Sequence, residues 1–132
     1  MSIEYRDSQD FRPDDLQELF LSVQWQSGNH SEKLAAAMKN SGSVFSAWDN
    51  GKLIGLINAL DDGAMTAYVH YLLVNPEYQG NGVGRQLLQM IKEKYKDYLR
   101  IVLISDASQV GFYQKQAFCA DKDAAAMFLD SF

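Results

Sequence analysis

The chain has little cysteine and little proline. Cys119 is the only cysteine in 132 residues, and there are two prolines. An intrachain disulfide is therefore excluded, no Cys-x-x-Cys metal motif exists, and little sequence is left for a proline-rich linker. A lone thiol beside an aromatic residue, here Phe118, is usually a small apolar group. We therefore expect Cys119 to be buried rather than nucleophilic.

Positive charge is also scarce. The chain carries 12 Lys and Arg against 17 Asp and Glu, which gives a formal net charge of −5. Nucleic-acid binders normally show a basic stripe, and this sequence has none, so nucleic acid is not an expected partner. One local phosphate site remains compatible with this charge.

Long apolar runs and a targeting segment are missing as well. Residues 1–7 lack the basic and apolar regions of a signal peptide, and no run approaches the length of a membrane span. A cytoplasmic location is expected, and a membrane is not an expected partner. Apolar residues make up 47% of the chain. The sequence therefore predicts one domain over residues 1–132 with a core of its own.

The first half of the sequence predicts a strand, two helices and a hairpin. Ile3 and Tyr5 alternate with polar residues, as in a short strand. One helix is predicted to start at Pro13 and a second at Ser31. The apolar runs 44–48 and 52–60 flank Asp49-Asn50-Gly51, and Asn-Gly between two such runs is a strong hairpin signal.

The second half predicts a parallel pair of strands. Residues 65–74 read as a third long strand, and residues 87–95 carry apolar positions at helical spacing. Residues 100–105 read as a buried strand that follows this helix, so it should run parallel to 65–74. A short helix over 108–116 and final strands at Phe118 and 124–129 complete a mixed sheet with helices on both faces.

A glycine-rich turn joins the strand 65–74 to the next helix. Gly80, Gly82 and Gly84 occupy alternate positions immediately before the amphipathic segment. Glycines allow a sharp bend and close approach of a ligand to the backbone. A helix N-terminus offers unpaired N–H groups and a positive dipole end, so the sequence predicts an anion site, such as one for a phosphate.

Two other phosphate motifs fit this turn poorly. A P-loop needs Lys followed by Ser or Thr after its last glycine, whereas Gly84 is followed by Arg85 and Gln86. A dinucleotide fingerprint needs a third glycine, which is missing. A purely structural strand-to-helix turn remains the simple alternative.

The order of elements, the Gln79-x-x-Gly82-x-Gly84 turn and the later segment 112–118 resemble the GNAT superfamily of acyl-CoA N-acetyltransferases. Agreement at the level of motifs covers about residues 68–118. The resemblance implies an α/β (α+β) fold with a mixed, mostly antiparallel sheet, in which a central parallel strand pair is splayed to bind CoA. It also implies acetyl-CoA as co-substrate, and no metal is expected.

The resemblance assigns the cofactor contacts residue by residue. Backbone at the end of the strand is expected to pair with the pantetheine arm, and the turn is expected to hold the pyrophosphate. Arg85 can add a charge-assisted contact. The predicted cofactor-binding residues are Leu72, Leu73, Val74, Gln79, Gly80, Asn81, Gly82, Val83, Gly84, Arg85, Asp106, Phe112 and Tyr113.

Two residues are predicted to be catalytic. The family commonly uses a tyrosine at the Phe-Tyr position to protonate the CoA thiolate, which implies Tyr113 as general acid. His70 is the candidate base, because imidazole titrates near the required range. Arylalkylamine N-acetyltransferases carry a catalytic histidine at the matching position, but their second histidine corresponds to Tyr68 here. Asp106 and Glu77 are weaker candidates for the base.

The acceptor is not readable from the sequence. In this fold the link between the first two helices covers the acceptor site, so Trp25 is predicted to contact substrate, with a core role as the alternative. The expected function is acetyl transfer to a primary amine of a small molecule or peptide by direct attack in a ternary complex, with a homodimer as the expected assembly. The alternative is a non-catalytic acyl-CoA-binding sensor or regulatory module.

Overall fold

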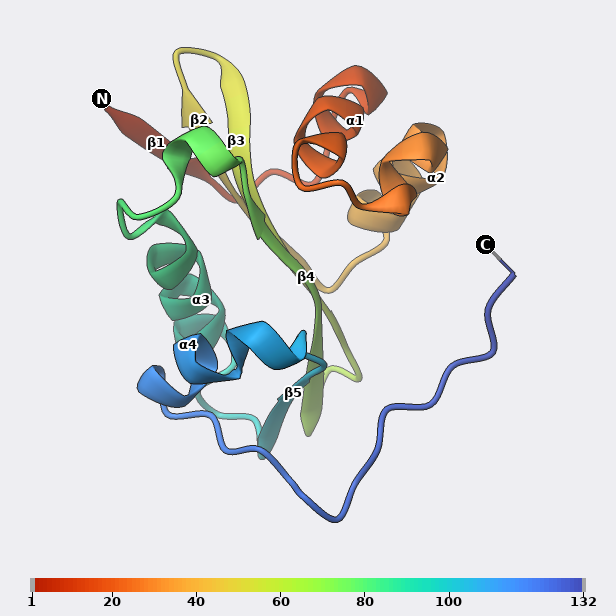
Figure 1. Ribbon diagram of the computed structural model, residues 1–132, viewed down its shortest axis with the longest axis vertical. Coiled ribbons are helices and arrows are strands. Elements are labelled where there is room, and N and C mark those ends of the chain that lie inside the picture. Colours follow the sequence, from red (N-terminus) through yellow and green to blue (C-terminus); the bar gives the residue numbers. More distant parts are fainter. Residues whose placement is uncertain (1, 132) are drawn as a thin grey trace. The chain divides into compact units, whose positions relative to one another are not determined.

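The computed structural model describes residues 2–131 (Figure 1). Two compact units make up the chain, Met1–Val102 and Leu103–Phe132. The strands are β1 (Ile3–Arg6), β2 (Ser43–Asp49), β3 (Lys52–Asp61), β4 (Thr66–Val74) and β5 (Arg100–Leu103). The α-helices are α1 (Pro13–Ser22), α2 (Ser31–Lys39), α3 (Val83–Lys94) and α4 (Val110–Lys115), and 3-10 turns are η1 (Gln26–His30), η2 (Pro76–Tyr78) and η3 (Ala107–Gln109).

The five strands form one sheet in the order β1-β2-β3-β4-β5. Neighbours from β1 to β4 pair antiparallel, whereas β4 and β5 run parallel. Both of these strands start at the same end, because the N–H groups of Leu99 and Arg100 donate to the carbonyl of Met65 at 2.9 and 3.1 Å. The predicted mixed sheet with a parallel pair is confirmed. That pair lies at one edge of the sheet formed by residues 2–131 rather than at its centre.

The predicted hairpin joins β2 to β3. Asp49 pairs with Lys52, so the loop has two residues, and both have positive φ: 51° at Asn50 and 80° at Gly51. These values are those of a type I′ turn, whose twist matches that of the flanking strands.

Helices cover both faces of the sheet (Figure 1). Helices α1 and α2 pack on one face, where their apolar residues join those of β2, β3 and β4 in one core cluster. Helix α3 packs on the opposite face and buries Val83, Leu87 and Ile91. Gly55 of β3 lies under its first turn, where an added Cβ would stand 3.1 Å from Val83 Cγ1 and 3.3 Å from Leu87 Cδ1. The missing side chain of Gly55 thus lets the start of α3 approach the sheet closely.

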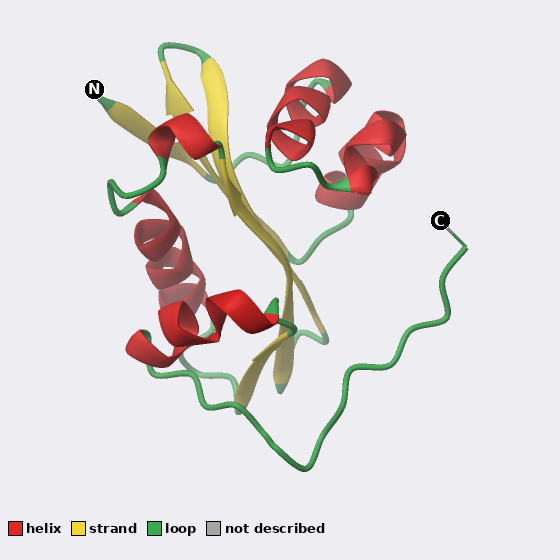
Figure 2. Ribbon diagram, viewed as in Figure 1, coloured by secondary structure: helices red, strands yellow, loops and turns green. Residues whose placement is uncertain are grey.

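The second unit departs from the sequence expectations after its helix. The predicted helix over 108–116 is confirmed by η3 and α4, but residues 118–131 form loop (Figure 2), so final strands at Phe118 and 124–129 are wrong. Residues 124–129 are apolar, but they lack the alternation of apolar and polar residues that lets a strand bury one face. Met127, Phe128 and Leu129 are all strongly exposed. Cys119 is exposed as well, which corrects its expected burial.

No helix in residues 2–131 is long and apolar enough to span a membrane.

Candidate active site

The chain leaves β4 through a turn fixed by Asn75. Its N–H donates to the carbonyl of Ile54 at 2.8 Å, and its side-chain Oδ1 accepts the N–H of Glu77 at 2.9 Å. Pro76 follows and cannot donate to a ladder, so pairing with β3 stops here. These contacts end the strand and start η2 at a defined point.

Glycine is required next by backbone conformation. Gly80 and Gly82 have φ of 83° and 79°, in the left-handed region that other residues enter at a cost. An added Cβ would meet no atom within 4 Å at Gly80, and at Gly82 only Arg85 Nη2 at 3.7 Å. The space beside Gly80 is therefore open, and at Gly82 only the end of the flexible Arg85 side chain comes close.

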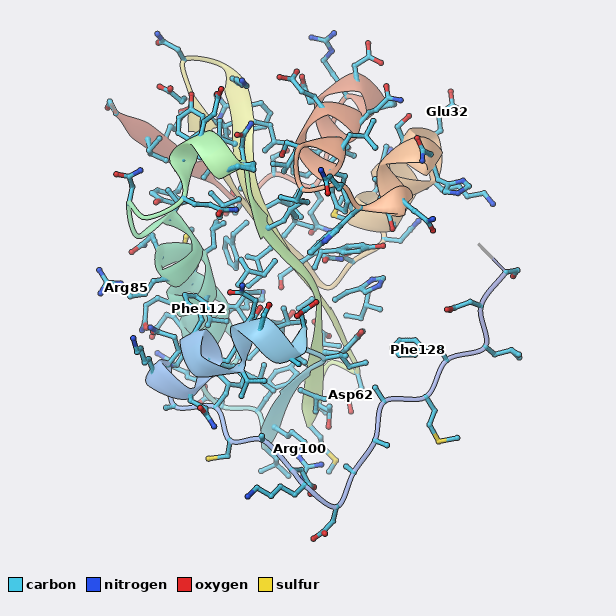
Figure 3. All side chains as sticks on the ribbon, viewed as in Figure 1. Glu32, Asp62, Arg85, Arg100, Phe112 and Phe128 are labelled. Atoms are coloured by element: carbon cyan, nitrogen blue, oxygen red, sulfur yellow. The ribbon has the colours of Figure 1, made fainter. Side chains whose placement is uncertain are left out.

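Gly82 is the N-cap of α3, and no side chain caps the helix. The first N–H groups of a helix have no intrahelical acceptor, so those of Val83, Gly84 and Arg85 are available to an anion. Arg85 is exposed and its side chain points outward from α3 (Figure 3). The backbone donors on which the predicted anion site depends are thus at the start of α3, and their use for a phosphate stays a prediction.

Side chains of the turn hold its shape instead of facing outward. Gln79 Nε2 donates to the carbonyl of Val74 at 2.9 Å, and Asn81 Nδ2 donates to the carbonyls of Tyr78 and Gln79 at 3.2 and 3.3 Å. The Tyr78 hydroxyl donates to Asp49 Oδ2 at 2.7 Å, a bond that raises its pKa. Among the residues predicted to contact cofactor, Gln79 and Asn81 therefore use their side chains to brace the backbone.

A β-bulge interrupts β4 at His70. On β3, Asn58 pairs with Tyr71 and the next residue, Ala59, pairs with Val69, so His70 has no partner across the ladder. Consecutive residues of a strand normally point to opposite faces. The extra residue at the bulge breaks that alternation and lets His70 and Tyr71 share one face.

His70 and Tyr71 belong to what we call the aromatic cluster, which also includes Phe20, Trp25 and Tyr68. The rings of His70 and Tyr71 stack with centroids 4.0 Å apart, and the ring of Tyr68 also stacks on that of His70, at 5.6 Å. Tyr71 also contacts Phe20 at 4.9 Å and Trp25 at 5.9 Å. Trp25, 38% exposed, and His70 are the most open members.

The position of Trp25 follows from how α1 ends. The N–H of Trp25 donates to the carbonyl of Phe20, and that of Gln24 donates to Leu21, at 3.1 and 3.0 Å. This is a Schellman motif, with Gln24 at φ 63° in the place usually held by glycine. The motif brings Trp25 onto Phe20, with ring centroids 6.1 Å apart. The predicted substrate residue is thereby directed into the aromatic cluster.

The environment of His70 favours its neutral form. Partial burial among the tyrosine rings lowers the pKa of the imidazole below its ordinary value of 6.5. A neutral imidazole at neutral pH can accept a proton, which is the state that a general base needs.

The second unit contains the remaining predicted residues. Tyr113 on α4 makes edge-on contacts with Phe112 and Phe118, at centroid distances of 5.1 and 6.0 Å. Burial raises the pKa of its phenol, so Tyr113 keeps its proton at neutral pH. Asp106 instead caps η3: its Oδ1 accepts from the N–H and hydroxyl of Ser108 at 2.9 and 2.8 Å, which lowers its pKa and weakens it as a base.

The turn at the end of α4 keeps its usual shape without a glycine. Ala117 has φ 73°, and the N–H groups of Ala117 and Phe118 donate to the carbonyls of Gln114 and Tyr113 at 3.1 and 3.0 Å. This second Schellman motif places Phe118 on Tyr113. Ala117 therefore occupies the left-handed position of this turn, which glycine usually holds, with both backbone bonds made.

Three structural residues escaped sequence reasoning. Tyr71 connects His70 to Trp25 and forms a hydrogen bond with Ser27 Oγ at 3.0 Å. Asn58 lies opposite the bulge, and Gln24 directs Trp25. A polar residue inside the apolar run 52–60 was the available signal for Asn58, and the other two carried none.

Comparisons with known proteins agree on one family. A model described as "Acetyltransferase (GNAT) domain" matches residues 8–126. A histone acetyltransferase from Glycine max is 35% identical over 122 residues, covering 83% of this chain and 52% of that protein. A chloroplastic serotonin N-acetyltransferase from rice is 29% identical over 99 residues, covering 70% and 50%.

A solved GNAT-family acetyltransferase from Streptococcus pneumoniae superposes with a TM-score of 0.84 at 25% identity, covering 98% of both chains. The chain belongs to the GNAT acetyltransferase family. It spans roughly half the length of the two curated relatives named above.

Proposed function

We propose that this protein transfers the acetyl group of acetyl-CoA to a primary amine of a small molecule or peptide, by direct attack in a ternary complex. Family membership supports the reaction class. The observation that carries the proposal is the uncapped N-terminus of α3, where Gly80 and Gly82 expose backbone donors beside open space. A pyrophosphate matches both the positive end of the helix dipole and the row of N–H groups.

The donor side is proposed to use backbone more than side chains. The N–H groups from residue 80 to residue 85 would hold the pyrophosphate, with Arg85 adding its charge. The backbone of Leu72 and Leu73 would pair with the pantetheine arm. The carbonyl of Val74 already accepts from Gln79, so Val74 has its N–H rather than its carbonyl to offer that arm.

The aromatic cluster is proposed to receive the acceptor amine. Ring faces attract a cation and also pack against an apolar body, so the cluster suits an arylalkylamine in particular. The relative named as a serotonin N-acetyltransferase agrees with such a substrate, whereas the relative named as a histone acetyltransferase points to a lysine side chain. Phe20 is fully buried, so Trp25 and His70 are the members offered to substrate.

The chemistry is proposed to need one base and one acid. His70 removes a proton from the ammonium group, directly or through water, and the amine nitrogen then forms a bond to the thioester carbon. The carbon–sulfur bond breaks and Tyr113 donates its proton to the departing sulfur to give the thiol. The second proton on the nitrogen leaves to water as the amide forms, and the Tyr113 phenol takes a proton back from solvent. Phe112 and Asp106, also in the second unit, are proposed to contact the cofactor.

Release of CoA thiol tests the proposal. Acetyl-CoA is incubated with tryptamine, spermidine or a lysine peptide, and thiol is measured over time while both substrates are varied. Thiol release with at least one amine and intersecting double-reciprocal lines are expected for a ternary complex. Tyr113→Phe should lower kcat by about 10²–10⁴-fold. Binding of acetyl-CoA without amine-dependent release, unchanged in Tyr113→Phe, would instead identify a sensor or regulatory module.

A single domain across 1–132, a homodimer and a cytoplasmic location stay predictions. Sedimentation velocity on the purified chain tests the homodimer, because a dimer doubles the mass of 14.9 kDa.

A further inference from the structure

Asn58 is a buried polar residue at the centre of the sheet. It lies on β3 among apolar neighbours and is 1% exposed. A carboxamide in such a place costs free energy unless its hydrogen bonds are made. The contacts of Asn58 therefore indicate why an apolar residue does not stand there.

Both ends of the Asn58 carboxamide have partners. Oδ1 accepts the backbone N–H of Tyr71 at 2.9 Å, and Nδ2 donates to Ser41 Oγ at 3.1 Å. The Ser41 hydroxyl donates in turn to the carbonyl of Ala37 at 2.7 Å. These partners fix the orientation of the Asn58 amide. The backbone N–H of Tyr71 can only donate, so it faces Oδ1. The Ser41 hydroxyl gives its proton to Ala37, so it accepts from Nδ2.

The bond to Tyr71 lies at the bulge itself. With His70 unpaired, the register shifts at Asn58, and the backbone N–H that follows the extra residue needs an acceptor. The Asn58 side chain supplies that acceptor. A regular register would need no such bond and would return consecutive residues to opposite faces.

We propose that Asn58 is the positioning residue of the acceptor site, because its carboxamide holds the bulge that turns His70 and Tyr71 to one face. Asn58 touches neither substrate in this proposal, whose functional part rests on the proposed acetyl transfer. It acts through the backbone of Tyr71. Loss of the bond frees the strand to shift by one residue, which would separate the stacked rings of His70 and Tyr71.

A spectroscopic readout separates positioning from simple loss of stability. The imidazole of His70 stacks on the Tyr71 ring at 4.0 Å with an interplanar angle of 22°, so ring currents should displace its proton resonances upfield. The chain has two histidines, and His30→Gln assigns the signals. This readout needs no substrate and no activity.

Three variants make the test. Asn58→Leu keeps the approximate side-chain size and removes both hydrogen bonds. Asn58→Asp keeps an acceptor for the Tyr71 N–H, and the Ser41 hydroxyl can turn to donate to its second oxygen. Ser43→Ala is the matched control: Ser43 is also buried and pairs with Ala59 beside the bulge, but its Oγ bonds the Tyr95 hydroxyl at 2.6 Å instead of Asn58, Ser41 or Tyr71.

Asn58→Leu is expected to remove the part of the upfield displacement of His70 that the Tyr71 ring causes, leaving the smaller part from Tyr68. Asn58→Asp and Ser43→Ala should retain the full displacement, although all three variants lower the melting temperature. With tryptamine as probe, kcat/KM for the amine should fall about 10–100-fold in Asn58→Leu, with little change in the KM for acetyl-CoA. An unchanged His70 spectrum in a folded Asn58→Leu protein overturns the proposal. If Asn58→Leu does not fold, loss of the displacement in folded Asn58→Asp serves as the overturning result.

The two arms fail independently. Should the wild-type chain acetylate none of the amines, the proposed function is rejected, yet the His70 spectrum still decides whether Asn58 holds the bulge. If the wild type acetylates tryptamine, and Asn58→Leu lowers kcat/KM for the amine and kcat/KM for acetyl-CoA by the same factor, the positioning role is rejected while the proposed function stands.

Discussion

The turn at residues 79–85, which we call the donor turn because we propose that it binds CoA, and the aromatic cluster are built in opposite ways. The turn uses consecutive residues, and its chemistry lies in backbone N–H groups at the start of α3. The aromatic cluster draws side chains from α1, from the chain just before η1, and from β4. The first is a local backbone conformation, and the second exists only once strands and helices have packed.

This difference determines how each region can fail. The donor turn depends on φ at Gly80 and Gly82, so one Cβ in the wrong place disturbs it. The aromatic cluster depends on strand register at His70 and on the end of α1 at Gln24. Donor binding and acceptor binding should therefore be separable by mutation.

The largest effect is expected at His70 on the acceptor side. His70→Gln should lower kcat/KM for the amine by about 10²–10⁴-fold, because the proposed general base is lost. In the wild type, kcat/KM should rise with pH through a pKa below about 6.5 and then level off, and this limb should disappear in the variant. A pH–rate profile measures both, and identical wild-type and His70→Gln profiles would remove His70 as base.

The lowered pKa of His70 also makes the stability of the fold depend on pH. Because the pKa of His70 is lower in the folded chain, the unfolded chain binds more protons between the two values. Stability from this residue is present above about pH 6.5 and is lost as pH falls toward the folded pKa. Urea denaturation at several pH values between 5 and 7 measures the free energy of unfolding. Its decrease with falling pH should be smaller in His70→Gln than in the wild type.

A second prediction breaks the donor turn alone. Gly82→Ala should weaken CoA binding by about 100-fold, because a shift at the N-cap misplaces two or more charge-assisted bonds. Left-handed alanine also costs about 1–2 kcal/mol of stability. Calorimetric titration with CoA measures the affinity.

Gly63→Ala is the control for this change. Gly63 has nearly the same φ, 78°, lies in the β3–β4 turn, and has no atom within 4 Å of an added Cβ, where Gly82 has only Arg85 Nη2 at 3.7 Å. It should cost similar stability and leave CoA affinity unchanged. Equal losses of affinity in both variants would mean that strain, not the cradle, controls binding.

A third prediction concerns Trp25. Trp25→Leu should raise KM for tryptamine by about tenfold, because ring-face contacts worth roughly 1–1.5 kcal/mol are lost, while CoA affinity stays the same. Steady-state kinetics measures it. A rise for tryptamine but not for spermidine would show that Trp25 recognises the aromatic body instead of the charge.

The backbone course of the donor turn was predictable because its signal is local, whereas its use for CoA stays a prediction. Glycine spacing, Pro76 and the amphipathic segment behind them are consecutive in sequence, and the Asn50-Gly51 hairpin was confirmed for the same reason. The bulge at His70 was not predictable, because it is a relation between β3 and β4. In the sequence, Asn58 indicates only a polar residue inside an apolar strand, and its bond to the Tyr71 N–H is visible only in the structure.

The final strands and Cys119 failed for a related reason. Composition after Phe118 is apolar, but a strand needs a partner edge and an alternating face as well as apolar residues. Residues 118–131 have neither in the structure, and Cys119 is exposed as a consequence.

The smallest expected effect is a gain of stability at the C-terminal ends of α1 and α4, which have the same backbone motif. Both α1 and α4 finish in Schellman motifs that bring an aromatic residue back onto the last turn: Trp25 onto Phe20, and Phe118 onto Tyr113. Each motif places a residue other than glycine, here Gln24 or Ala117, in the left-handed region.

Replacing either residue by glycine relieves that strain. Gln24→Gly and Ala117→Gly should each stabilise the fold by a few tenths to about 1 kcal/mol, since the strain relieved exceeds the entropy that glycine adds to the unfolded chain. Denaturant melts measure the gain. Because the two backbone bonds persist in Gln24→Gly, Trp25 should stay in place and KM for tryptamine should not change. A rise in that KM would mean that the strained residue itself holds Trp25 against its neighbours, and that the aromatic cluster needs the strain to keep its shape.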